Sequence, residues 1–237
     1  MPLASPFTQF AIIAMVAVLA PLFVWAVRNA GDKHESSQQT LRWTGIALTV
    51  VAAWLGISTL IAKSGILREF DHRPPPFVLL AFGFTLATAV LAFSPLGTRL
   101  VTGTAIKWLI LFQVFRIPVE LWLHRLYEEG VVPVQMTYSG RNFDIVSGIL
   151  ALVLGVWALK SRPPRWAIWL FNIAGLMLLI NIVTIAVMST PTPLRRFFNE
   201  PANTFIADWP FVWLPAFLVQ AAWFGHLLVF RWLQRKS

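Results

Sequence analysis

Long apolar stretches alternate with short polar ones along the whole chain. Most of the apolar stretches have the length of about 17–25 residues that a helix needs to cross a bilayer. The segments between them are too short to hold a water-soluble domain. The pattern predicts an all-α, polytopic integral membrane protein: a single transmembrane domain, residues 1–237, with seven helices in one bundle. The predicted spans cover about residues 9–27, 43–62, 77–94, 103–126, 144–160, 166–188 and 210–231.

The composition indicates a surface that faces lipid. Of the 237 residues, 57% are hydrophobic and only 12% are charged, whereas soluble domains carry about 25% charged residues. The chain has no cysteine, which excludes disulfides, thiolate metal sites and a cysteine nucleophile. The lipid bilayer is therefore the main expected partner, and we expect no cofactor and no metal.

The basic residues indicate the orientation in the membrane. The net charge of +9 is spread over small clusters at the ends of the apolar stretches, as in positive-inside anchors, which argues against nucleic acid as a partner. More Lys and Arg residues fall on the cytoplasmic side if the N-terminus lies outside. We therefore expect an outside N-terminus, a cytoplasmic C-terminus and a multi-pass protein of the plasma membrane or a bacterial inner membrane. Tryptophans near the predicted span ends, among them Trp25, Trp122 and Trp166, are expected in the headgroup region.

A polar stripe interrupts the fourth apolar stretch. Arg116, Glu120 and His124 are spaced four residues apart, so on a helix they share one face. Arg116 lies near the middle of its span, where a charge costs about 2.5–3.5 kcal/mol on insertion scales. Glu120, one turn away, is its expected partner. The stripe predicts either a structural ion pair or a site for a ligand, an ion or a proton.

Two features lie next to this stripe. Pro118 removes a backbone hydrogen bond and should kink the helix. Arg141, Asn142 and Asp144 directly precede the fifth span. Asn142 or Asp144 would cap that helix, or Arg141 and Asp144 would fold over the stripe and close a charged pocket.

Three amide side chains lie within the spans. Gln113 is one turn before Arg116, Asn181 lies at a similar depth in the sixth span, and Gln220 is central in the seventh. Together they could line a polar cavity between the fourth, sixth and seventh helices. Buried amides also join transmembrane helices to each other without any further role. His226 is expected toward the cytoplasmic end of the seventh span, at a different depth from His124.

These residues favour a membrane protein with a charged pocket in the outer half of the bundle, which binds, senses or transports a small polar or anionic ligand or protons. One alternative is a structural or accessory subunit whose charges serve assembly, for example in an oligomer. The other is a membrane-embedded enzyme acting on a lipid or quinone-like substrate, with Glu120 or His124 as general base and Arg116 stabilising negative charge. The sequence shows no nucleophile and base at a recognisable spacing, so we lean away from an enzyme.

Overall fold

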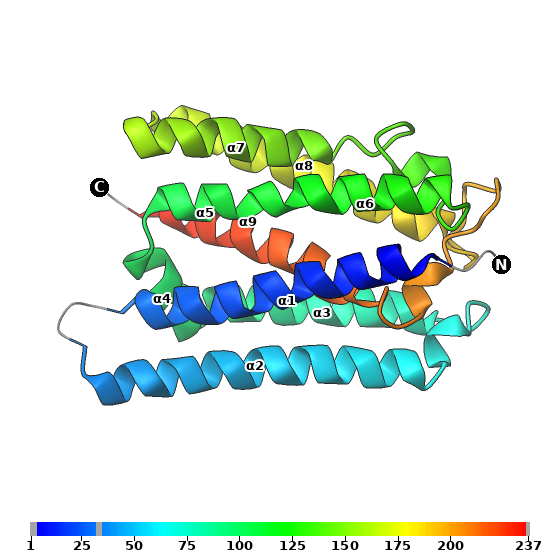
Figure 1. Ribbon diagram of the computed structural model, residues 1–237, viewed down its shortest axis with the longest axis horizontal. Helices are drawn as coiled ribbons and strands as arrows, with labels where there is room; N and C mark the ends of the chain where they lie inside the picture. The colour runs from blue at the N-terminus through cyan, green and yellow to red at the C-terminus, as the bar shows by residue number, and fades with distance from the viewer. Residues whose placement is uncertain (1–3, 32–34, 236–237) are drawn as a thin grey trace.

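The computed structural model describes residues 4–31 and 35–235, and its architecture is all-α (Figure 1). Most helices run roughly along the long axis of a single bundle. α1 begins at one end, here called the N-terminal end, and α9 finishes at the opposite end. The helices are α1 (Pro6–Asn29), α2 (Ser37–Lys63), α3 (Pro76–Phe93), α4 (Pro95–Gly103), α5 (Ile106–Phe112), α6 (Arg116–Glu128), α7 (Ile145–Lys160), α8 (Arg165–Ser189) and α9 (Val219–Gln234).

Several of these helices could cross a membrane. Within the described parts of the chain, five are long and apolar enough: α1, α2, α3, α8 and the Leu214–Gln234 segment that contains α9. A sixth arises if α4 and the Ile106–Glu128 segment, which meet at a bend of 112°, count as one broken span. α7 is apolar but has only 16 residues. The protein is therefore a membrane protein with several spans, and the count of seven stays a prediction.

Several helices begin at residues that favour helix starts. The Ser5 hydroxyl caps α1, and Ser36 forms a capping box with Gln39 at the start of α2. Pro76 and Pro95 occupy the first positions of α3 and α4, where a missing N–H group costs nothing. The polar connections between the apolar stretches thus contain the signals that set these boundaries.

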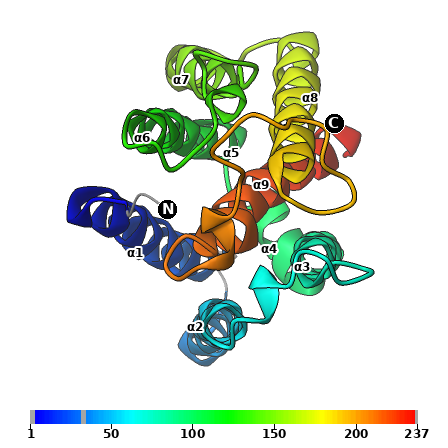
Figure 2. The same ribbon diagram turned by 90° about the vertical axis from the view of Figure 1, so that its right-hand side faces the viewer.

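α9 forms the centre of the bundle and α2 lies at its edge. Viewed from the end in Figure 2, α9 lies between α8 and α3, and it packs against both of them and against α5. The apolar part of the Leu214–Gln234 segment is 56% buried, against 17% for α2. The outward faces of the outer helices present large apolar side chains such as Phe7 and Leu60, each 70% exposed, as expected of a surface in contact with lipid.

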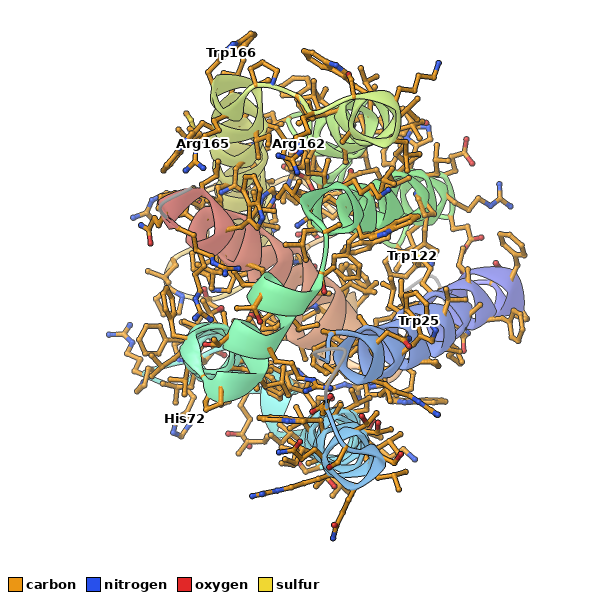
Figure 3. All side chains as sticks on the ribbon, turned by 90° about the vertical axis from the view of Figure 1, so that its left-hand side faces the viewer. Trp25, His72, Trp122, Arg162, Arg165 and Trp166 are labelled. Carbon is orange, nitrogen blue, oxygen red and sulfur yellow. The ribbon has the colours of Figure 1, made fainter. Side chains whose placement is uncertain are left out.

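The tryptophans fulfil the interfacial expectation only in part. Trp25 and Trp166 are 62% and 66% exposed near helix ends, and Trp166 projects away from the bundle in Figure 3. Trp122 differs from these two because it faces the interior of the bundle. Its ring is buried, and its Nε1–H donates to the Thr8 carbonyl at 2.8 Å. Trp122 therefore packs α6 against α1.

Two helices are irregular next to a proline. A 3₁₀ turn, Gln113–Phe115, separates α5 from α6, one turn before Pro118, whose missing N–H leaves a carbonyl in this region free. A π-helical turn, Leu214–Leu218, contains Pro215 and leads into α9. Its Ala216 carbonyl accepts a hydrogen bond from Trp54 Nε1 at 2.5 Å. The expected disturbance near Pro118 is therefore present, and it lies directly before the polar stripe.

Candidate functional site

Arg116 is buried in the middle of the bundle and fully engaged there. Only 2% of it is exposed. Its Nε donates to Asp144 Oδ2 at 2.7 Å and its Nη2 to Asp144 Oδ1, which makes a two-pronged ion pair. Its Nη1 donates to the Gly175 carbonyl at 3.2 Å and lies 2.9 Å from His226 Nε2. Two hydrogen bonds in the fork geometry make this a strong pair.

The ion-pair partner of Arg116 differs from the one expected. Among the described residues it is Asp144, not Glu120. The reason is the shortness of α7, which at 16 residues is about 24 Å long, less than the roughly 30 Å of a bilayer core. The segment before α7 therefore descends into the bundle and carries Asp144 to the depth of Arg116.

The same descent changes the roles expected of Asn142 and Asp144 as helix caps. Asp144 occupies the N-cap position of α7, but its side chain makes no capping hydrogen bond. Instead it binds Arg116 and accepts from Ser147 Oγ at 3.2 Å. Irregular backbone at membrane depth is tolerated where protein surrounds it, and both Asn142 and Asp144 are buried.

Asn142 connects the Glu120 carboxyl group to the backbone of Asp144. Its Nδ2 donates to Glu120 Oε2 at 2.5 Å and to the Met136 carbonyl at 3.0 Å. Its Oδ1 accepts from the Asp144 backbone N–H at 3.0 Å. Glu120 is only 2% exposed, and Asn142 gives it its one hydrogen bond among the described residues. Glu120 is therefore a buried carboxyl group with no ion-pair partner in the part of the chain that the structure describes.

On the other side, the network extends through His226 on α9 to α8. His226 Nδ1 lies 2.9 Å from Asn172 Oδ1, and both residues are completely buried. Since an arginine can only donate, Nε2 of His226 is the acceptor and Nδ1 carries the hydrogen toward Asn172. Gly175 makes this approach possible, because a Cβ there would overlap His226 Cε1 and lie 2.8 Å from Nε2. The charged network, as we use the term, is Glu120, Asn142, Asp144, Ser147, Arg116, His226 and Asn172.

The charged network borders a cavity of about 100 Å³, which we call the charged cavity. Arg116, Glu120 and Asp144 form its polar part, and Gln220 adds an amide. Its other walls are apolar side chains of α3, α6, α8 and the Leu214–Leu218 turn. A volume of this size holds about three water molecules, each taking about 30 Å³ in the liquid, or a small polar group.

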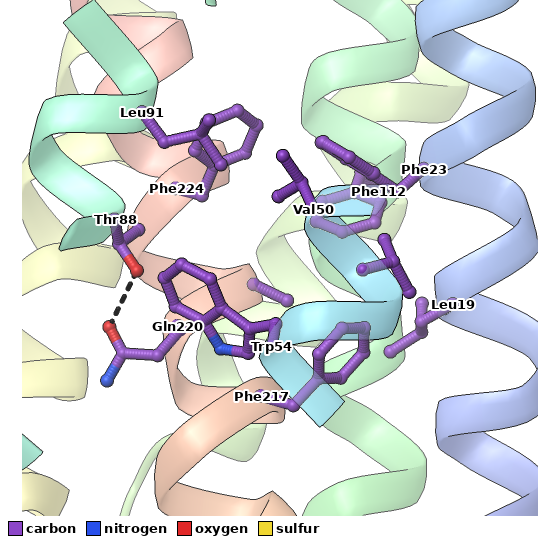
Figure 4. Close-up of a pocket in the computed structure, with 12 residues that line it drawn as sticks. Leu19, Phe23, Val50, Trp54, Thr88, Leu91, Phe112, Phe217, Gln220 and Phe224 are labelled. Atoms are coloured by element: carbon purple, nitrogen blue, oxygen red, sulfur yellow. Dashed lines mark hydrogen bonds between the residues drawn. The ribbon is translucent and has the colours of Figure 1, made fainter. Parts of the chain in front are cut away.

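A second cavity, of about 70 Å³, is almost wholly apolar (Figure 4). Side chains of α1, α2, α3, α5 and α9 line it, Trp54 and Phe224 among them. Its polar edge is the Thr88–Gln220 pair, in which the Thr88 hydroxyl donates to Gln220 Oε1 at 3.1 Å. Gln220 lines both cavities and thus forms part of the wall between them.

The remaining candidates divide between the bundle core and its N-terminal end. Gln113 is buried and donates to the Ala222 carbonyl at 2.9 Å, so it joins the 3₁₀ turn after α5 to α9. His124 stacks on Tyr138 at the N-terminal end, with 4.3 Å between ring centroids. It therefore does not continue the stripe into the charged network.

Arg141 and Asn181 also lie away from the network. Arg141 is exposed, and its guanidinium lies over the Phe197 ring at 5.4 Å. Asn181 donates to the Arg141 carbonyl at 2.9 Å. Asp144 lines the charged cavity, whereas Arg141 and Asn181 are not part of its lining, and their predicted role in a binding site stays a prediction.

The comparison with protein families gives a match over most of the bundle. Residues 75–234 match a family described as Domain of unknown function (DUF8737), and this range is more than half of the chain. The chain belongs to the DUF8737 family. No curated protein and no solved structure gives a significant match.

The DUF8737 range contains the whole charged network and helices α3 to α9, whereas α1 and α2 precede it. All seven residues of the network thus come from the part of the chain that defines membership in DUF8737. The apolar cavity differs, because α1 and α2 contribute part of its lining.

Proposed function

We propose that this DUF8737 protein binds protons within the membrane, for sensing or for transport, and that Glu120 is the group that takes up and releases the proton. The observation that carries the proposal is that Glu120 is buried and has no ion-pair partner among the described residues. Its carboxyl group is 2% exposed and borders the charged cavity, while the nearby guanidinium of Arg116 is engaged by Asp144.

The charges of the network favour a proton over an anion. Arg116 and Asp144 neutralise each other, so an ionised Glu120 gives the buried site a net negative charge. An uncompensated charge in apolar surroundings costs several kcal/mol unless it is neutralised. A proton or a cation removes this cost, whereas an anionic ligand would add to it. Among the ligands that the sequence allows, the proton therefore fits best.

The hydrogen-bond pattern supports a role beyond local packing. Asn142 holds Glu120 with one end of its amide and the Asp144 backbone with the other. Asp144 in turn holds Arg116, which contacts α8 at Gly175 and α9 at His226. A change in the charge of Glu120 therefore acts on groups that join α6, α7, α8 and α9.

Infrared difference spectroscopy of the purified protein in lipid tests the protonation of Glu120. We expect a carboxylic-acid C=O band that changes with pH and is lost in Glu120→Gln. The matched control is Glu128→Gln on the same helix, because the Glu128 side chain is 50% exposed; this variant should keep the band. A band unchanged in Glu120→Gln would overturn the proposal.

A second measurement separates proton binding from the structural alternative. In liposomes that contain a pH-sensitive dye, a protein that conducts protons dissipates an imposed pH gradient, and Glu120→Gln should slow this. In an accessory subunit whose charges serve only packing, Glu120→Gln would leave both the infrared band and the gradient unaltered. The stripe would then serve only to hold the helices together.

A further inference from the structure

The charged cavity is lined in part by two helices, α3 and α8, that lie on either side of α9. α3 contributes Phe77, Ala81 and Thr85 to its lining, and α8 contributes Val183 and Val187 among others. Both helices pack against α9, and Figure 2 shows them on either side of it. Ala81, Thr85, Val183 and Val187 are all partly exposed. The partly exposed side of the cavity therefore lies between α3 and α8, and we call this side the α3–α8 cleft.

The N-terminal end of the same cavity is covered. Met136 and Ile206 belong to its lining, and each is only 1% exposed. They lie in short 3₁₀ turns, Val134–Met136 and Phe205–Ala207, within the loops at that end of the bundle. Access from the aqueous side thus meets two buried side chains, whereas access from lipid meets partly exposed ones.

We infer that the charged cavity binds a lipophilic amine that enters from the bilayer through the α3–α8 cleft, with its nitrogen at the Glu120 carboxyl group and its alkyl chain in the cleft. This rests on the proposed function, because it uses Glu120 as the proton-carrying group. A cavity of about 100 Å³ has room for the amino group and the first carbons. The rest of the chain then lies between apolar side chains such as Leu179 and Val183.

Charge decides between the possible amphiphiles. An amine that arrives neutral from lipid takes the proton from the Glu120 carboxyl group, so an N–H bond forms as an O–H bond breaks. The product is an ammonium–carboxylate pair, and the net charge of the buried site does not change. A fatty acid would instead place a second carboxyl group beside Glu120. An alcohol fits by shape, but it forms no charge-assisted hydrogen bond, which is about twice as strong as a neutral one.

The probes are decylamine, decanol and decanoic acid, which share their chain length, with binding to the protein in nanodiscs measured by native mass spectrometry and by displacement of a fluorescent alkylamine. We expect decylamine to bind about ten-fold or more tightly than decanol, because the amine forms a charge-assisted hydrogen bond with Glu120. A factor of ten corresponds to about 1.4 kcal/mol. Decanoic acid should bind most weakly. Glu120→Gln should bring decylamine to the level of decanol.

Val183→Trp tests the route, because an indole at this partly exposed lining position fills the cleft. It should weaken decylamine binding at least ten-fold and leave the Glu120 infrared band in place. The control is Ile180→Trp on the same helix, where the side chain is 57% exposed and outside the cavity lining; it should bind as the unmodified protein does.

The outcomes separate this inference from the proposed function. Equal binding of all three probes, or undiminished decylamine binding in Val183→Trp, overturns the amine site while a pH-dependent Glu120 band upholds the proton site. A decylamine preference that survives in Glu120→Gln overturns the inferred role of Glu120. Loss of the infrared band in Val183→Trp would mean that the variant disturbs the fold, and the narrower Val183→Phe then replaces it with the same expected results.

Discussion

Replacing Arg116 by Met should destabilise the protein far more than the same change at Arg125. Arg116→Met keeps most of the side-chain volume but leaves Asp144, which is 4% exposed, as a buried carboxylate without a cation. Breaking a buried pair from one side costs about 3–5 kcal/mol. The Arg125 side chain is 54% exposed and pairs with Glu128, which is 50% exposed; exposed pairs contribute about 0–1 kcal/mol. Its second partner, Glu129, keeps its hydrogen bonds from Ser5 and Thr8 when Arg125 is replaced.

The assay is the free energy of unfolding in mixed micelles, titrated with a denaturing detergent. A loss of about 3–5 kcal/mol is a large part of the roughly 5–15 kcal/mol that stabilises a typical protein, so Arg116→Met should also lower the yield of folded protein. The double variant Arg116→Met, Asp144→Asn should recover much of the loss, because it removes both charges. Equal effects of Arg116→Met and Arg125→Met, or no recovery in the double variant, would refute the reasoning.

Further predictions concern substitutions at three positions. Gly175→Ala should destabilise the protein by about 1–3 kcal/mol through overpacking against His226, seen as a lower melting temperature. Gly83→Ala, on an open helix face with no neighbour within 4 Å, should instead stabilise its helix by up to about 1 kcal/mol; melting both variants side by side checks this. Partial burial raises the pKa of Glu129, but hydrogen bonds from Ser5 and Thr8 outweigh it and bring that pKa below its usual value of 4.5. Because the pKa of Glu129 is lowered on folding, its ionised form stabilises the folded state at pH values above about 4.5, and this stabilisation is lost as the pH falls through the lowered pKa. Glu129→Gln should therefore flatten the melting-temperature profile below about pH 4.5.

The sequence located the centre of the site but not its partners. Charge near the middle of an apolar stretch predicted a buried Arg116, and four-residue spacing placed Glu120 beside it on one helix. The identity of the counter-ion depends on tertiary structure, because Asp144 reaches Arg116 only through the descending segment before α7. One signal was present in the sequence: 144–160 is the shortest of the predicted apolar stretches, so a polar segment had to supply the missing depth.

His226 shows how a small boundary error hides a contact. The predicted seventh span, 210–231, placed it toward one end, whereas the observed segment Leu214–Gln234 brings it near the middle and level with Arg116. A shift of a few residues moves a side chain by about 5 Å, since each residue advances the helix by about 1.5 Å. Asn172 was missed for a related reason, because an amide's partner depends on how α8 and α9 are rotated relative to each other.

The choice of Asp144 over Glu120 as the partner of Arg116 changes what the network can do. An Arg116–Glu120 pair would lie within one helix and be independent of how the other helices pack. In the observed arrangement the guanidinium joins the start of α7 to α6, α8 and α9, and among the described residues the Glu120 carboxyl group is held by Asn142 alone. Asn142 contacts both carboxyl-bearing residues, so one amide links the Glu120 carboxyl group to the start of α7. Under the proposed function, a site built in this way would couple proton binding at Glu120 to the packing of these four helices.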